Sequence, residues 1–311
     1  MILAGIDEAG YGPTLGPLVV AASALRTSRE IDAEGEWPQW RLRYCRAVKI
    51  ADSKELYSPH KGIGPLEKAV LSFAALLSSE AGHLRDFLER RALEGAREAL
   101  GLPWYSGRRD VPWACDGEDV KRASASVKRC LDREGLEYLG SWICVVDAVR
   151  YNRIVERVGN KATLLFGRAS ILMHMLWREF GHEGVYLTVD RHGGRKFYGG
   201  LMDIAFPHTG IDVLSESEDC SIYRLYDVGR EMWVRFKVRA DAADTSAALS
   251  SMWAKYTREL FMDLFNRYWL ARARGVKKTA GYWGDGDRFL ADLMESQVID
   301  AGEAARFRRT R

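Results

Sequence analysis

The chain has 311 residues, 47% of them hydrophobic and 29% charged, proportions typical of a globular protein with one or two domains. Its formal net charge of +3 does not by itself indicate a nucleic-acid-binding protein. The C-terminal end is locally basic, which a solvated surface explains equally well. Five cysteines without CxxC or CxxH spacing indicate a reduced, cytoplasmic compartment. No apolar run approaches the roughly 20 residues that span a bilayer, and we expect no signal peptide.

The chain opens with an apolar run that ends in two acids. Met1 to Ile6 predicts a buried strand, and Asp7 and Glu8 follow at its end. Carboxylates at a strand tip cost desolvation energy unless a cation compensates them, so both are candidate ligands of a hard metal ion. Gly10 and Gly12 leave the next turn bare for close approach to a ligand. The alternative is an ordinary hairpin turn with solvated acids.

The segments that follow alternate between apolar and polar patterns. A second apolar run, Leu18 to Leu25, predicts another strand, and the polar stretch 30–43 predicts a surface segment. Trp142 to Val146 is a further strand candidate, and 103–116 is expected to be irregular. Helical spacing predicts helices at Leu66–Ser79, His83–Leu100, Gly117–Glu134, Asp147–Val158 and Ala162–Phe180.

Two more apolar runs lead to acids in the second half of the chain. Val185 to Asp190 predicts a strand that ends in a carboxylate. A hairpin is expected over 221–238, and Asp241 follows its second strand. The next segment, Ala243 to Arg267, predicts a long helix with an alanine- and serine-rich face that can lie close to a sheet. A short last helix is expected at Asp287–Met294.

Three acid-tipped strands together indicate a metal-dependent nuclease. Two-metal nucleases need several carboxylates that converge on ions about 3.5–4 Å apart, and the strands of one sheet can hold them with that precision. The sequence alone does not place these strands side by side, and each acid taken singly is compatible with an ordinary surface position. Asp244 lies one helical turn into the next element, and we do not expect it to be a ligand.

Several motifs occur in a fixed order from the first residues to about Leu290. They are Asp7-Glu8-Ala9-Gly10-Tyr11-Gly12-Pro13 with Gly16-Pro17, Asp52-Ser53-Lys54-Glu55-Leu56, Asp147 and Asn152 before Ala162-Thr163-Leu164-Leu165, Val189-Asp190, Arg239-Ala240-Asp241 with the helix through Arg258, and Gly281-Tyr282. Together they resemble the motifs of the ribonuclease HII family. The joint match is specific, whereas any one motif alone is weak.

This resemblance implies an α/β, ribonuclease H-like fold with a mixed central sheet flanked by helices and a helical C-terminal part, 243–311. It implies an endonuclease that cuts at ribonucleotides in RNA/DNA hybrids or RNA–DNA junctions and leaves 5′-phosphate and 3′-hydroxyl ends. Two Mg²⁺ or Mn²⁺ ions would activate the attacking water and stabilise the leaving oxygen. By the same resemblance, the catalytic metal ligands are Asp7, Glu8, Asp190 and Asp241.

The resemblance also implies how nucleic acid would be held. The backbone of Gly10, Tyr11 and Gly12 would recognise the ribose 2′-hydroxyl. Tyr282 would stack on a neighbouring sugar or base, although packing of the last helix is the alternative role for its ring. The expected phosphate contacts are Lys54 and Arg239.

The chain also departs from the family pattern. Tyr11 replaces an arginine, and the loop after Asp190 is altered. His192 in that loop is a weak candidate for proton transfer, with an inert loop histidine as the alternative. We interpret 82–137 as an insertion and the hairpin 221–238 as an addition to one catalytic domain, 1–311. Because these changes put the substrate in doubt, a same-fold nuclease for another DNA structure and a non-catalytic nucleic-acid-binding protein stay open. No membrane contact or obligate protein partner is expected.

Overall fold

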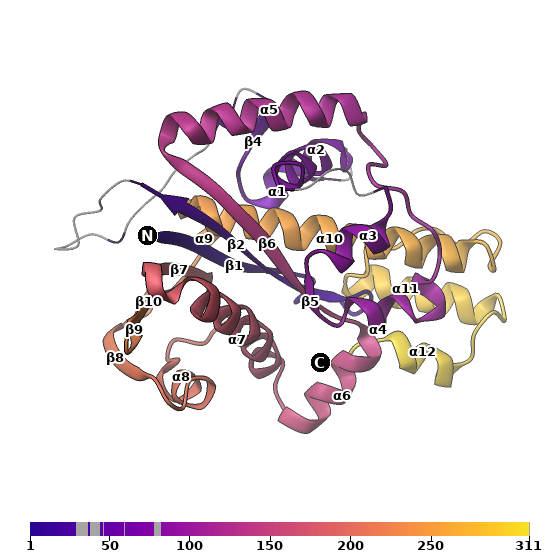
Figure 1. Cartoon of the computed structure of the whole chain (residues 1–311). Coiled ribbons are helices and arrows are strands. Elements are labelled where there is room, and N and C mark those ends of the chain that lie inside the picture. The colour runs from indigo at the N-terminus through magenta and orange to yellow at the C-terminus, as the bar shows by residue number, and fades with distance from the viewer. Residues whose placement is uncertain (29–36, 38–43, 46, 59, 78–81, 311) are drawn as a thin grey trace.

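The computed structural model describes residues 1–28, 37, 44, 45, 47–58, 60–77 and 82–310. Its centre is an eight-stranded mixed sheet in the order β5-β6-β2-β1-β7-β10-β9-β8 (Figure 1). The strands are β1 Ile2–Ala9, β2 Leu18–Thr27, β5 Ala92–Glu94, β6 Leu136–Val146, β7 Val185–Asp190, β8 Gly210–Glu216, β9 Cys220–Asp227 and β10 Arg230–Lys237, and a small second sheet joins β3 Tyr44–Cys45 to β4 Val48–Lys49.

Three neighbouring strands of the main sheet run in the same direction. β1 pairs parallel with β7, and β7 pairs parallel with β10. Opposite Val189 of β7, the register places Ile6 on one side and Phe236 on the other. Because the carboxyl ends of parallel neighbours meet at one edge of a sheet, this register brings the ends of all three strands together.

Helices cover both faces of the sheet. In Figure 1, α2, α5 and α10 lie on one face and α7 lies on the other. The α-helices are α1 Ser53–Leu56, α2 Gly64–Ala74, α3 Leu84–Glu89, α4 Ala96–Leu100, α5 Gly117–Glu134, α6 Ala148–Val158, α7 Lys161–Phe180, α8 Gly199–Ala205, α9 Ala240–Ala243, α10 Thr245–Leu270, α11 Trp283–Glu295 and α12 Ala301–Phe307. The predicted class, a mixed sheet flanked by helices with a helical C-terminal part, is therefore confirmed.

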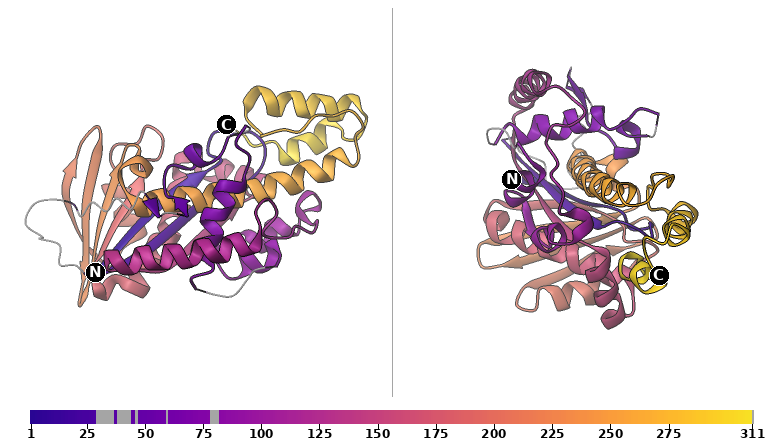
Figure 2. Two further views of the ribbon diagram at one scale, coloured as in Figure 1. Left: turned by 90° about the horizontal axis from the view of Figure 1, so that it is seen from above. Right: turned by 90° about the vertical axis from the view of Figure 1, so that its right-hand side faces the viewer.

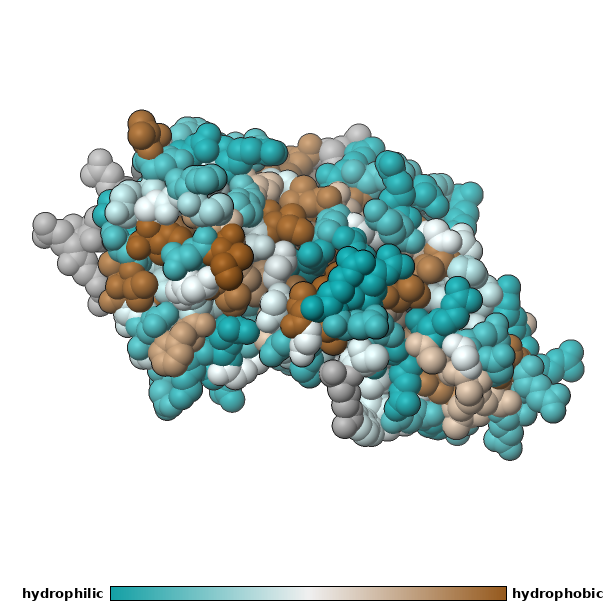
Figure 3. Space-filling view, turned by 90° about the horizontal axis from the view of Figure 1, so that it is seen from below, coloured by the Kyte–Doolittle hydropathy of each residue, from teal (hydrophilic) through white to brown (hydrophobic). Residues whose placement is uncertain are grey.

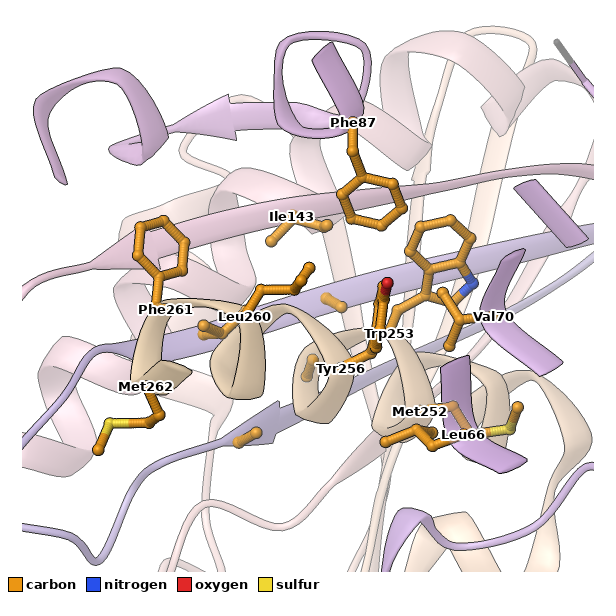
Figure 4. Packing of buried hydrophobic residues seen from close by; sticks show 14 of the residues in the cluster. Leu66, Val70, Phe87, Ile143, Met252, Trp253, Tyr256, Leu260, Phe261 and Met262 are labelled. Carbon is orange, nitrogen blue, oxygen red and sulfur yellow. The ribbon is translucent and has the colours of Figure 1, made fainter. Parts of the chain in front are cut away.

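The long helix α10 packs directly on β1. A Cβ atom at Gly5 would lie 2.2 Å from the backbone nitrogen of Ala247, so only glycine fits there. The Ser250 hydroxyl donates to the Gly5 carbonyl at 2.8 Å. The small-residue face predicted for this helix is thus the face that meets the sheet. Farther along, large side chains fill the core, where Phe87 stacks on Trp253 with ring centroids 5.4 Å apart (Figure 4).

Several local predictions differ from the structure. The expected helix His83–Leu100 is broken, because Ala92 pairs with Ile143 of β6 and forms the edge strand β5. This long-range pairing overrides the local helical pattern. The last predicted helix begins earlier, at Trp283, and α12 was not predicted. The surface segment 30–43 lies outside the described residues apart from Trp37.

The two predicted additions differ in their place in the fold. The hairpin 221–238 supplies β9 and β10 and is part of the main sheet, with β10 beside β7. The segment 82–137 contributes α3, α4, α5 and the edge strand β5. Figure 2 shows α11 and α12 gathered at the end of the molecule opposite β8 and β9.

The surface carries both polar and apolar side chains. Figure 3 shows a face covered mostly by polar residues, with apolar residues exposed in scattered groups. In the part of the chain that the structure describes, none of the helices has the length and apolar character to cross a membrane.

Candidate metal centre

Three carboxylates converge at the shared edge of β1 and β7. Asp7, Glu8 and Asp190 each offer one oxygen, and these oxygens all lie within 4.8 Å of one another. Asp7 is only 6% exposed, and the other two side chains are partly buried. Acids brought this close without a cation repel one another, whereas a divalent ion uses such oxygens as ligands.

Asp241 lies next to this group but is not part of its tightest cluster. The chain leaves β10 through Arg239, which has a positive φ of 53°, and Asp241 then falls in the short helix α9. The Ala240 amide donates to the Asp190 carboxylate at 2.9 Å, so Asp190 fixes the start of α9. Burial, followed by the charges of Asp52 and Asp190, raises the pKa of Asp241 to about 6.

Burial and mutual repulsion raise the pKa values of the clustered acids, because both disfavour the negatively charged form. Burial, with added repulsion from Glu8 and Asp190, raises the pKa of Asp7 well above its usual range. Burial and the charge of Asp190 raise the pKa of Glu8 to about 8. Burial also raises the pKa of Asp190. Four acids with raised pKa values at one sheet edge are a donor set that fits divalent cations.

Lys54 partly offsets this negative charge. Its side chain is 85% exposed and its Nζ lies 3.7 Å from the Asp52 carboxylate. The charge of Lys54 lowers the pKa of Glu8, Asp190 and Asp241, so the ammonium faces the carboxylate group. The predicted phosphate contact is thus at the rim of the site.

Asp52 is a site residue that the sequence analysis did not single out. It caps α1 by accepting from the Lys54 amide at 2.9 Å, and its charge raises the pKa of both Asp190 and Asp241. The Asp-Ser-Lys motif was a sequence signal for this region. It did not show that the capping acid would lie beside the strand tips.

The two glycines near Tyr11 have different environments. Gly10 has φ of 89°, and a Cβ atom there would lie 2.5 Å from the Pro17 carbonyl oxygen, so the interior of the protein requires this glycine. A Cβ atom at Gly12 would meet nothing within 4 Å. Gly12 is therefore the position at which the bare backbone faces open space.

Tyr11 lies against the loop that follows Asp190. A Cβ atom at Gly193 would be 3.4 Å from the Tyr11 hydroxyl, and the Lys161 Nζ lies 4.8 Å from the centre of the Tyr11 ring. The ring is half-buried, and burial raises the pKa of its hydroxyl. The side chain thus packs on a neighbouring surface of the protein.

Tyr282 is exposed close to the turn that carries Gly10. It precedes α11, and its side chain is 53% exposed. The preceding Gly281 carbonyl accepts from the amides of Thr14 at 2.8 Å and Leu15 at 3.1 Å. The segment with Tyr282 is therefore tied to the N-terminal turn, and the Arg258 guanidinium lies 5.8 Å from the centre of the exposed ring.

Two polar residues near the site, His192 and Asp244, are buried inside the protein. His192 is 1% exposed, and burial lowers its pKa to about 3. Its ring packs against Phe166 and Tyr198. Asp244 is buried and caps α10 by accepting from the Ser246 amide at 2.9 Å.

Comparison with known proteins supports the resemblance to ribonuclease HII. No family model matches the chain. A ribonuclease HII from Methanocaldococcus jannaschii is 43% identical over 56 residues, which are 18% of this chain and 19% of that protein. The match thus spans about a fifth of the curated relative. The predicted resemblance to this family is confirmed over the matched segment.

Solved structures of ribonucleases HII and HIII align with most of the chain. The PCNA:RNase HII complex from Archaeoglobus fulgidus gives 15% identity and a TM-score of 0.42, covering 100% of this chain and 95% of that one. Bst-RNase HIII in complex with Mn²⁺ has 15% sequence identity and a TM-score of 0.43, and the alignment covers 99% of this chain and 66% of that one. The ribonuclease H2 from Pyrococcus horikoshii OT3 has 14% identity and a TM-score of 0.43, and the alignment covers 99% of this chain and 92% of that one.

Proposed function

We propose that this chain is a metal-dependent endonuclease that hydrolyses phosphodiester bonds at ribonucleotides in RNA/DNA hybrids or RNA–DNA junctions. The observation that carries the proposal is the convergence of Asp7, Glu8 and Asp190, whose oxygens lie within 4.8 Å of one another. The 56-residue match to a ribonuclease HII supports the same class of activity. The expected products carry a 5′-phosphate and a 3′-hydroxyl.

The carboxylates would hold two divalent ions, Mg²⁺ or Mn²⁺. Asp7, Glu8 and Asp190 form the central oxygen cluster, and Asp241 would complete the set from the start of α9. When bound, such ions activate an attacking water and stabilise the leaving 3′ oxygen. The protein contributes by holding the acids on strand ends, where the sheet fixes their separation.

The surrounding residues offer the contacts that a nucleic acid needs. Lys54 is an exposed cation beside the carboxylates, and Arg239 is an exposed cation two residues before Asp241. Both suit backbone phosphates. The open space at Gly12 admits a sugar close to the backbone, and a 2′-hydroxyl can both donate to and accept from main-chain groups. The exposed ring of Tyr282 can stack on an adjacent sugar or base. Action without an obligate protein partner and a cytoplasmic location stay predictions.

A panel of labelled duplexes tests this function. The substrates are an RNA/DNA hybrid, a DNA duplex with one ribonucleotide, the matching all-DNA duplex and a DNA junction, each with Mg²⁺, Mn²⁺ or EDTA. We expect metal-dependent cleavage only where a ribonucleotide is present, and no cleavage by Asp190→Asn. Cleavage of the junction alone would favour a nuclease for another DNA structure. Binding without any cleavage would favour a non-catalytic protein.

A further inference from the structure

The C-terminal residues Arg308, Arg309 and Thr310, here called the C-terminal anchor, lie against the turn of residues 10–14, here called the glycine turn. The Arg309 side chain is 4% exposed. Its Nε donates to the Pro13 carbonyl at 2.9 Å and its Nη2 donates to the Gly10 carbonyl at 2.6 Å. The Arg309 amide donates to the Thr14 carbonyl at 2.8 Å. One residue 299 positions from Gly10 thus holds three carbonyls of the glycine turn.

The rest of the anchor and α6 keep Arg309 in this place. The Asn152 side-chain amide donates to the Arg308 carbonyl at 2.8 Å, and its oxygen accepts from the Thr310 amide at 2.8 Å. Asn152 therefore brackets Arg309 on both sides. The guanidinium also lies 4.5 Å from the centre of the Tyr151 ring, which favours a cation over the ring face.

The burial of this guanidinium is costly. Burial lowers the pKa of Arg309 to about 10, and among the described residues no carboxylate forms an ion pair with it. A buried charge without a counter-charge is stable only if hydrogen bonds compensate it. The compensation here consists of main-chain carbonyls at Nε and Nη2, whose directions are fixed in return. The buried Nη1 has no hydrogen-bond partner among the described residues.

The orientation of the Gly10 carbonyl determines where the next amide points. In a trans peptide unit the N–H lies opposite the C=O. Since the Gly10 carbonyl faces Arg309, the Tyr11 N–H points away from Arg309. Within the described part of the chain, no group accepts a hydrogen bond from that N–H. It is therefore a donor left free beside the candidate metal centre.

We propose that Arg309 is a positioning residue, which turns the Gly10 and Pro13 carbonyls inward and so presents the Tyr11 amide as a donor to a sugar or phosphate oxygen of the bound strand. This inference rests on the proposed function. The Thr14 amide, next to the anchored Pro13 carbonyl, donates to the Gly281 carbonyl. Through this peptide unit, Arg309 is also linked to the segment that carries Tyr282.

The test compares Arg309→Met and Arg309→Lys with the control Arg308→Met. The control removes only a side-chain contact from Arg308 to Asp287 at 2.7 Å and leaves the glycine turn untouched. Hydrogen–deuterium exchange of the unliganded full chain measures the order of the glycine turn. Values of kcat and KM on duplexes that differ by one 2′-hydroxyl measure how much the glycine turn contributes to substrate recognition.

We expect exchange of the Thr14 amide, which donates to the Gly281 carbonyl, to accelerate at least about tenfold in Arg309→Met, with the control unchanged, since the charge-assisted hydrogen bonds that hold the glycine turn are lost. Discrimination between ribose and deoxyribose should fall by about tenfold or more. Arg309→Lys should remain impaired, because a point charge cannot hold two carbonyls as the guanidinium fork does. Asn152→Ala removes only the hydrogen bonds to the Arg308 carbonyl and the Thr310 amide. It should change the exchange rate and the sugar discrimination in the same direction by a smaller factor.

Unchanged exchange in both Arg309 variants and in Asn152→Ala would overturn the proposal. So would faster exchange with unaltered KM and sugar discrimination, because Arg309 would then be merely structural. If the wild-type protein does not cleave ribonucleotide duplexes, the proposed function fails and the substrate role of Arg309 fails with it. The exchange measurement still decides whether Arg309 orders the glycine turn, so the two failures are distinguishable.

Discussion

Asp7→Asn should stabilise the metal-free protein while it destroys the candidate metal centre. The Asp7 Oδ1 accepts from the Glu8 amide at 2.7 Å, and the asparagine oxygen can keep this hydrogen bond. The substitution otherwise removes one buried negative charge from a group whose oxygens lie within 4.8 Å of one another. It changes the electrostatics of the site with little change in side-chain volume.

The magnitude follows from Coulomb's law. Two unit charges 4.8 Å apart repel by about 3.5 kcal/mol at an effective dielectric constant of about 20. Partial protonation relieves much of this, because the pKa of Glu8 is already raised to about 8. We therefore expect the free energy of unfolding of the metal-free protein to increase by about 1–2 kcal/mol at pH 9, which raises the melting temperature by a few degrees.

The pH dependence has a definite sign. The pKa of Glu8 in the folded protein is about 8, above its ordinary 4.5, so the folded state binds more protons than the unfolded state between these values. The free energy of unfolding of the metal-free wild type must then fall as the pH rises from about 4.5 to 8. The fall should be shallower in Asp7→Asn, and the two proteins should converge near pH 4.

Urea unfolding in EDTA at pH 4, 7 and 9 measures this difference, and added Mn²⁺ should then stabilise the wild type but not the variant. Asp203→Asn, which changes an exposed acid on α8, is the matched control and should follow the wild type throughout. A variant less stable than the wild type at pH 9, with the same pH slope, would refute the reasoning.

Five further variants test the substrate contacts. Tyr282→Ala should weaken duplex binding by about 1–3 kcal/mol at an unchanged melting temperature, with Tyr282→Phe close to wild type; lost stability with unchanged binding would mean that the ring packs the fold. Gly12→Ala should lower cleavage at least about tenfold without loss of stability. Gly10→Ala should unfold more easily, because its methyl group would lie 2.5 Å from the Pro17 carbonyl oxygen. Equal losses of stability in the two variants would contradict this distinction. Tyr11→Arg should keep the preference for ribose in the paired duplexes, and a preference that only this variant shows would indicate another natural substrate.

The local features of the site could be predicted from the sequence. An apolar run that ends in an acid predicted the strand tips at Asp7 and Asp190. The structure places Asp190 at the end of β7 and Asp7 two residues before the end of β1, which continues to Ala9. Their convergence could not be predicted from the residues alone. It depends on the parallel pairing of Ile6 with Val189, and no local pattern specifies a pairing over that distance.

The features that were missed are those set by distant contacts. A helix was expected across Ala92, but pairing with β6 makes that segment a strand. Arg309 belongs to a basic end for which a solvated surface was an open interpretation, yet its guanidinium is buried under the glycine turn. Asp52 looked like one member of a motif, and its influence on Asp241 arises only because α1 folds back to the sheet edge.

Calorimetric titration of Mn²⁺ into the full chain at pH 7 tests the central claim, that these carboxylates form a metal centre, most directly. Repeating it in buffers of different ionisation enthalpy counts the protons released on binding. We predict two bound ions and net proton release, because Glu8 with a pKa of about 8 is largely protonated before metal binds, and Asp190→Asn should lose this binding. Equal affinity in the wild type and Asp190→Asn, or binding without proton release, would contradict the account.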